Sequence, residues 1–127
     1  MKKDQIKPTE SELEILQIIW QIGPATVRQI NDILSAKREV GYTTTLKLLQ
    51  IMDQKGIVST DKSMRTHIYT AVLKEEETQK NLIDQLLSQA FGGSASKLVM
   101  QALGNSKPKQ SELDELKSFI QKWEENK

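Results

Sequence analysis

The sequence predicts a mainly α-helical fold with one small β-hairpin, and three observations lead to this prediction. Apolar residues recur every three or four positions in several segments, as they do on one face of a helix. Glycine and proline separate these segments, and two of them begin with a Thr-x-x-Glu or Thr-x-x-Gln pattern. Two short β-like runs flank a polar tip. We therefore expect a compact unit at residues 1–73 and a purely helical region at residues 74–127.

The first helix is expected to begin after Pro8, because Thr9 and Glu12 have the spacing of a capping box. Gly23-Pro24 then ends the helix. Its apolar face consists of Leu13, Leu16, Ile19 and Trp20.

The second helix repeats the capping-box pattern with Thr26 and Gln29. A polar, turn-like segment at residues 35–41 leads from it to the third helix. The predicted inner face of the second helix consists of Val27, Ile30, Ile33 and Leu34.

The third helix carries Leu46, Leu49 and Met52 at helical spacing, and Gly56 stands where it would stop. Two β-like runs follow, at residues 57–60 and 66–72, around the tip at residues 61–65. A helix, a glycine turn and a hairpin with a basic tip follow one another in the order of a winged helix-turn-helix. Other small α+β domains also place a hairpin after a helix.

Three helices are predicted in residues 74–127. Gly92-Gly93 separates the first from the second, which Ser94 would cap, and residues 104–108 separate the second from the third, which Ser111 would cap. So many apolar residues cannot all be buried within so short a region, which favours a homodimer interface over a tail that packs on its own domain. The candidate dimerisation residues are Leu86, Leu87, Phe91, Leu98, Val99, Leu103, Leu113, Leu116, Ile120 and Trp123.

Charge is distributed unevenly along the chain, although the formal net charge is only +1. Residues 26–73 contain seven lysine or arginine residues against four acidic ones, whereas residues 74–127 contain eight against nine. The basic excess thus coincides with the predicted third helix and hairpin, as a surface that contacts phosphates requires.

Double-stranded DNA is therefore the expected partner. Hydroxyls near the start of the third helix would face the major groove, unless Thr43 is used as the N-cap, and the basic tip would contact the DNA backbone or minor groove. The candidate DNA-binding residues are Arg28, Tyr42, Thr43, Thr44, Lys47, Lys62, Ser63 and Arg65. The alternative is a winged-helix adaptor that binds proteins and has no sequence-specific affinity for DNA.

Catalysis and metal binding are not expected. The chain has no cysteine and a single histidine, His67, which is read as a strand residue of the hairpin. We therefore predict no enzyme activity, no cofactor, no metal site and no small-molecule ligand. The start of the chain lacks the apolar segment of a signal peptide, so a cytoplasmic location is expected.

Several motifs along the chain, in this order, resemble the penicillinase-repressor family (the BlaI/MecI type). The motifs are Leu13-Glu14-Ile15-Leu16 with Ile19-Trp20, Gly23-Pro24-Ala25-Thr26-Val27, Tyr42-Thr43-Thr44, Lys55-Gly56, Arg65-x-His67-x-Tyr69, Phe91-Gly92-Gly93-Ser94 and the closing helix from Ser111 to Leu116.

The resemblance implies a homodimeric winged-helix repressor on an inverted-repeat operator. It further implies a membrane-bound sensor metalloprotease that relieves repression by cutting the dimerisation helices. Residues 98–102 read Leu-Val-Met-Gln-Ala where members of the family have Leu-Val-Leu-Asn-Phe, so the corresponding bond joins Gln101 to Ala102. The absence of cysteine argues against the copper-responsive branch of the family.

Overall fold

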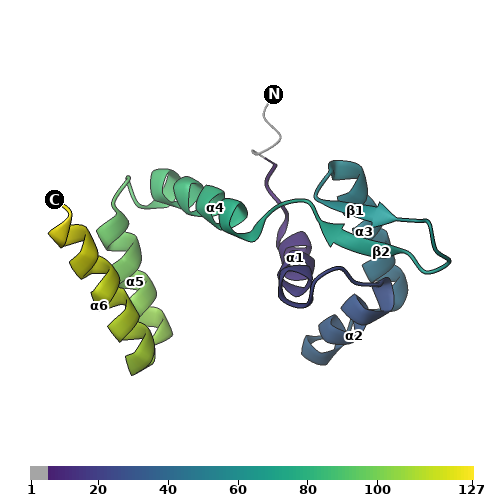
Figure 1. Ribbon diagram of the computed structural model, residues 1–127, viewed down its shortest axis with the longest axis horizontal. Coiled ribbons are helices and arrows are strands. Elements are labelled where there is room, and N and C mark those ends of the chain that lie inside the picture. The colour runs from purple at the N-terminus through teal and green to yellow at the C-terminus, as the bar shows by residue number, and fades with distance from the viewer. Residues whose placement is uncertain (1–5) are drawn as a thin grey trace. The chain divides into compact units, whose positions relative to one another are not determined.

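The computed structural model describes residues 6–127 and confirms a mainly helical chain with a two-stranded antiparallel hairpin (Figure 1). The chain divides into two compact units, of which the first ends at Ile83 and the second runs from Asp84 to Lys127. The elements are α1 (Glu10–Ile22), α2 (Val27–Lys37), α3 (Tyr42–Lys55), β1 (Val58–Asp61), β2 (Ile68–Ala71), α4 (Glu75–Ala90), α5 (Ala95–Ser106) and α6 (Gln110–Glu125).

Both predicted capping boxes are present. The hydroxyl of Thr9 accepts a hydrogen bond from the backbone N–H of Glu12 at 3.2 Å, and the Glu12 carboxylate accepts one from the backbone N–H of Thr9 at 2.9 Å. Thr26 and Gln29 repeat this exchange at 3.2 and 2.9 Å. Each pair satisfies backbone donors that a helix start leaves without an intrahelical partner, so the local sequence fixes where α1 and α2 begin.

The core of the first unit is formed by α1, α2, α3 and the hairpin. The predicted face of α1 was incomplete, because Ile15 and Ile18 are also buried while Leu13 and Trp20 are only partly buried. The reason is that α1 packs against both α2 and β2, so it buries more than one stripe. The Trp20 indole N–H donates to the backbone carbonyl of Leu73 at 2.9 Å, which ties α1 to the segment after the hairpin.

Helix α3 begins at Tyr42 with Gly41 as its N-cap, so Thr43 is not the cap. It ends at Gly56, whose φ of 82° is left-handed and therefore suits glycine. In the hairpin, Val58 pairs with Ala71 and Asp61 with Ile68. Strand β1 is therefore shifted by one residue from the predicted run 57–60, and β2 is shorter than the predicted run 66–72.

An isolated antiparallel bridge adds a third segment beside β2. The backbone of Ala25 exchanges hydrogen bonds with Tyr69, at 3.0 Å from the Ala25 N–H and 2.8 Å from the Tyr69 N–H. The turn before α2 is thereby held against the hairpin.

In the second unit, Gly92 and Gly93 take positive φ angles after α4, and the Ser94 hydroxyl caps α5, as expected. Two predictions were wrong. Gly104 does not break α5, which continues to Ser106 and ends where Lys107 takes a left-handed φ of 48° before Pro108. Ser111 does not cap α6, which begins at Gln110 after an N-cap at Lys109 that makes no side-chain cap bond.

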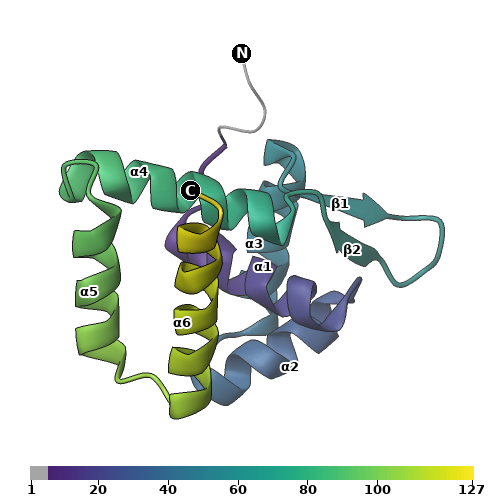
Figure 2. The same cartoon turned by 60° about the vertical axis from the view of Figure 1, so that its left-hand side comes forward.

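Within the second unit, the turn after Ser106 joins α5 to α6 (Figure 2). None of residues 84–127 is buried, although α4, α5 and α6 all carry large apolar side chains. No helix among residues 6–127 is long and apolar enough to span a membrane.

Candidate nucleic-acid interface

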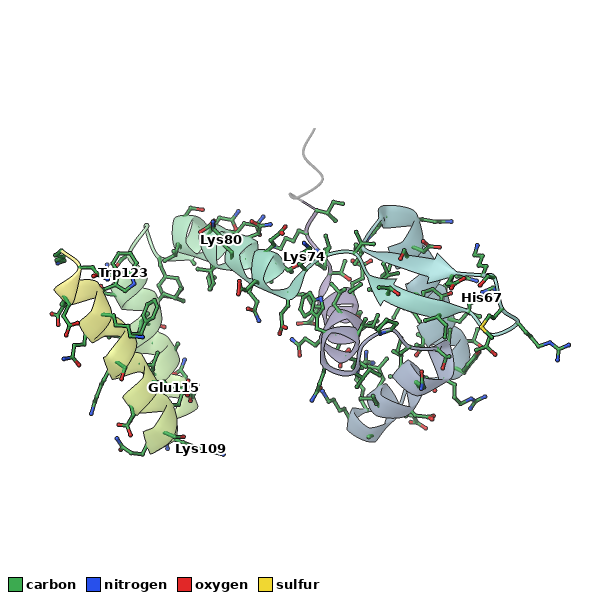
Figure 3. The ribbon with its side chains drawn as sticks, in the orientation of Figure 1. His67, Lys74, Lys80, Lys109, Glu115 and Trp123 are labelled. Carbon is green, nitrogen blue, oxygen red and sulfur yellow. The ribbon has the colours of Figure 1, made fainter. Side chains whose placement is uncertain are left out.

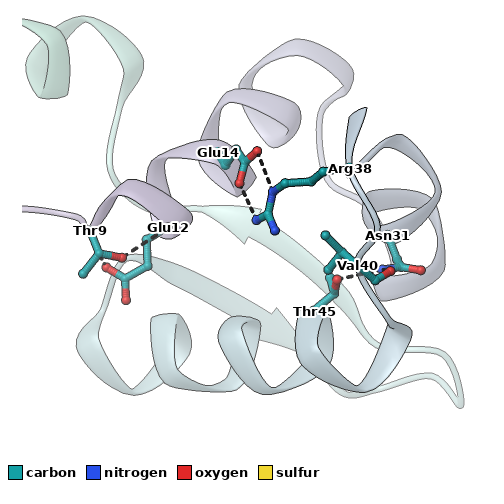
Figure 4. Close-up of polar contacts among 7 residues, drawn as sticks. All are labelled: Thr9, Glu12, Glu14, Asn31, Arg38, Val40 and Thr45. Atoms are coloured by element: carbon teal, nitrogen blue, oxygen red, sulfur yellow. Dashed lines mark hydrogen bonds and ion pairs between the residues drawn. The ribbon is translucent and has the colours of Figure 1, made fainter. Parts of the chain in front are cut away.

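Helices α2 and α3 are joined by a buried polar contact. The side-chain amide of Asn31 donates to the hydroxyl of Thr45 at 2.8 Å and to the carbonyl of Val40 at 3.0 Å (Figure 4). Asn31 and Thr45 are 8% and 0% exposed, so water does not compete for these bonds. The hydroxyl of Ser35 also donates to the Val40 carbonyl, at 3.0 Å. These bonds fix α3 relative to α2 and to the turn between them.

The anchoring of Thr45 orients the start of α3. Thr45 faces inward, whereas Tyr42, Thr43, Thr44 and Lys47 are exposed. Thr43 is not an N-cap, so its hydroxyl is not used to cap α3. Small hydroxyls, a phenol and an ammonium group are side chains that can donate to base edges and phosphates.

The hairpin tip, here called the wing (residues 61–67), is exposed throughout and carries Lys62, Ser63 and Arg65. The Asp61 carboxylate accepts the Ser63 backbone N–H at 2.9 Å, and the hydrogen bonds from Ser63 hold the pKa of Asp61 below its usual value. Behind the wing, the hydroxyl of Thr60 donates to the Asp53 carboxylate at 2.8 Å. This bond ties β1 to α3, so the wing is held beside the helix.

A cleft of about 380 Å³, here called the wing cleft, lies between α2, α3 and the wing. It brings together Arg28, Tyr42 and Arg65, which the sequence separates widely. The Arg28 guanidinium carbon lies 5.1 Å from the centre of the Tyr42 ring, within the range of a cation–π contact. Thr43, Thr44, Lys47, Lys62 and Ser63 do not line the cleft.

Two of the seven basic residues in the segment 26–73 are paired with α1. Among residues 6–127, the ion pairs are Arg38 with Glu14 at 2.7 Å and Lys55 with Glu12 at 2.8 Å. Sequence reasoning missed both pairs, since the partners are distant in the chain. Lys47, Lys62 and Arg65 form no ion pair among the residues that the structure describes, so their charges remain available to a ligand.

No group of three or more His, Asp or Glu side chains in the described part of the chain could hold a metal ion. His67 lines the wing cleft and is the last residue of the wing, directly before β2, so the prediction that it lies within a strand was wrong (Figure 3). The sequence had identified this residue only as part of a strand, and the pattern Arg65-x-His67 contained no signal that both line one cleft.

A second candidate surface is formed by the apolar residues of α4, α5 and α6. Of the predicted dimerisation residues, Leu86, Val99, Ile120 and Trp123 are 44%, 43%, 56% and 65% exposed. The remaining six are partly buried: Leu87, Phe91, Leu98, Leu103, Leu113 and Leu116.

Met100 and Phe119 are 65% and 62% exposed and were not among the predicted dimerisation residues. Phe119 was missed because it lies outside the spacing of Leu113, Leu116, Ile120 and Trp123 on α6. The Phe119 and Trp123 rings lie 6.4 Å apart at 57°. Gln101 and Ala102 are exposed in the middle of α5.

The sequence of this chain is similar to those of several known proteins. The chain is 26% identical over 112 residues to an uncharacterized 16.5 kDa protein of Latilactobacillus sakei, covering 88% of this chain and 77% of that protein. It is 34% identical over 80 residues to the transcriptional regulator BlaI of Mycobacterium tuberculosis, covering 62% of this chain and 58% of BlaI.

The similarity extends further along a third relative. The chain is 22% identical over 120 residues to the penicillinase repressor of Staphylococcus aureus, covering 94% of this chain and 95% of that protein. The family model described as penicillinase repressor matches residues 8–122, and the chain therefore belongs to the penicillinase repressor family.

Proposed function

We propose that this protein is a transcriptional repressor that binds an inverted-repeat DNA operator as a homodimer. Family membership and relatives named as a regulator and a repressor support the regulatory role. The observation that carries the DNA-binding part is the inward anchoring of Thr45 by Asn31, which leaves Tyr42, Thr43, Thr44 and Lys47 exposed beside the wing.

In this proposal residues 1–73 form the DNA-binding domain. Helix α3 enters the major groove, where Tyr42, Thr43 and Thr44 contact base edges and Lys47 contacts a base or phosphate. Arg28, Lys62, Ser63 and Arg65 contact the sugar-phosphate backbone, which supplies affinity and fixes the register.

Residues 74–127 form the dimerisation domain. Its support is the apolar surface of residues 84–127, in which no residue is buried within a single chain. Burial of one large apolar side chain contributes about 1.5–3 kcal/mol, so several of them at a dimer interface would outweigh the cost of association.

Repression is relieved by cleavage of the Gln101–Ala102 bond by a membrane-bound sensor metalloprotease. Both residues are exposed, which gives a protease access, but they lie within helix α5. A protease needs an extended segment, so the central turns of α5 must unwind before the cut. The cut would remove α6 and its exposed Ile120 and Trp123 from the chain.

The DNA-binding proposal is tested by selecting duplexes from a random-sequence library with the full-length protein and then titrating the selected duplex across salt concentrations. An inverted repeat is expected, with affinity that falls steeply as salt rises because phosphate contacts release counterions. The rival adaptor would enrich no sequence. Failure to enrich any duplex, at any salt concentration, would contradict the proposal.

A further inference from the structure

His67 lies among cations in the wing cleft. Helix α2 contributes Arg28 to the lining, α3 contributes Tyr42, and the hairpin contributes Arg65 and Tyr69. The other lining residues are uncharged: Thr26, Val27, Leu46, Gln50 and Thr66. The cleft is thus lined by the permanent positive charges of Arg28 and Arg65 and by the His67 imidazole, and no carboxylate lines it.

His67 is also the only histidine in the 127 residues, and the chain has no cysteine. Imidazole is the side chain whose ordinary titration falls between pH 5 and 8. A change in binding across that interval that a side chain causes can therefore be assigned to one position in the chain.

We propose that His67 is a further DNA-contacting residue, which holds a backbone phosphate in its protonated form and so links DNA binding to proton uptake. This inference rests on the proposed function. A phosphate placed between Arg28 and Arg65 would lie beside the imidazole, and a nearby anion favours the charged form of a histidine. Any imidazole that is neutral in the free protein takes a proton from solvent when DNA binds and returns it when DNA leaves.

The consequence is a repressor whose hold on DNA tightens as pH falls. A protonated imidazole gives the phosphate a charge-assisted hydrogen bond, which is shorter and stronger than a neutral one. Since the contact is to the backbone, the effect should be independent of base sequence. It should therefore be measurable with a DNA duplex of arbitrary sequence.

The test uses the full-length protein and a fluorescein-labelled random-sequence duplex of about 30 base pairs at low salt, with binding followed by anisotropy. Wild-type affinity should rise about tenfold between about pH 7.5 and about pH 5.5, the size of one added charged contact. His67→Gln should bind with little dependence on pH and should match wild type near pH 7.5. His67→Lys should bind tightly at both pH values, because its charge does not change.

A relocated imidazole provides the matched control. The double variant His67→Gln, Thr70→His keeps one histidine on an exposed position of β2 outside the lining of the wing cleft. It should remain insensitive to pH, and circular dichroism should show the same helix content in all variants. DNA binding by wild type without pH dependence, or pH dependence that persists in His67→Gln, would overturn the inference. Absence of DNA binding at every pH would instead refute the proposed function.

Discussion

Glu12 and Lys55 lie 43 positions apart in the chain and form an ion pair of 2.8 Å between the carboxylate Oε2 and the ammonium Nζ. The Glu12 side chain is 2% exposed, whereas the Lys55 side chain is 42% exposed, so only the lysine of this pair is open to solvent. Burial raises the pKa of the Glu12 carboxyl, but hydrogen bonds from Lys55 and Thr9 outweigh it and leave the pKa below its usual value. The start of α1 is thereby fastened to the end of α3.

The first prediction follows from the asymmetry of this pair. Lys55→Gln should lower the free energy of unfolding by about 1–2 kcal/mol, because the Glu12 carboxylate is left buried without its cation. Urea denaturation near neutral pH measures this loss. Arg38→Gln removes the cation from the exposed Glu14 pair and is the matched control, for which a markedly smaller loss is expected. Equal losses would show that burial of Glu12 does not matter.

The second prediction concerns acid. Because the pKa of Glu12 is lower in the folded protein, its contribution is present above the ordinary pKa of about 4.5 and is lost as pH falls through the folded value. Glu12→Gln keeps an oxygen that can accept the Thr9 N–H but removes the titrating group. Its stability should therefore fall less steeply than that of wild type below about pH 4.5. Glu14 and Asp61 also have lowered pKa values, so some acid sensitivity should remain.

The third prediction concerns the contact between Asn31 and Thr45. Asn31→Ala and Thr45→Val should each lower the free energy of unfolding by about 1–3 kcal/mol, since each removes the hydrogen bond between the two buried side chains. The double variant should lose less than the sum of the two, because both changes remove the same bond. Thr44→Val, at the exposed neighbouring position, should change stability by less than about 0.5 kcal/mol. Additive losses in chemical denaturation would contradict the coupling.

Local signals in the sequence were enough to predict most element boundaries. The capping-box patterns at Thr9 and Thr26 correctly predicted where α1 and α2 begin. Gly56 correctly predicted the end of α3, because the left-handed conformation there suits glycine. The corrections also have local causes. A glycine such as Gly104 makes a helix interior less stable than alanine does by only about 1 kcal/mol, so α5 continues through it. Pro108 has no backbone N–H to donate and cannot continue the helix.

The contacts that hold the candidate site in place could not be predicted in the same way. The Trp20 indole reaches the carbonyl of Leu73, and Ala25 pairs with Tyr69, across long stretches of chain. A helical pattern shows which face of α3 is apolar, but it does not show that Thr45 belongs inside. That assignment depends on Asn31, whose buried amide requires an acceptor at that place.

The fourth prediction concerns two of the proposed DNA-binding residues. Lys47→Ala and Arg65→Ala should each weaken binding to the selected duplex by about 1–3 kcal/mol. If Arg65 contacts a phosphate, its loss should also reduce the slope of log affinity against log salt by about 0.9. Lys117→Ala removes the same charge from α6 and is the control, for which no change in affinity is expected. Wild-type binding by both variants would refute the assignment of α3 and the wing.

The last prediction joins assembly to control. A single winged helix makes few phosphate contacts and should bind weakly, whereas two held on one dimer make the second half-site contact effectively intramolecular. The gain can be on the order of 10²–10⁴ without any new contact to DNA. Ile120→Asp places a charge on a side chain that is 56% exposed in the single chain, so it should raise the dimer dissociation constant at least about tenfold while the first unit stays folded. Ser118→Asp, on the same helix, is the matched control, and sedimentation velocity measures both.

A fragment ending at Gln101 lacks α6 altogether and should likewise lose most of its affinity for a full inverted repeat, yet bind a single half-site as the intact chain does. If the fragment binds the full repeat as tightly as the intact chain, dimerisation through residues 74–127 does not supply the affinity for the operator.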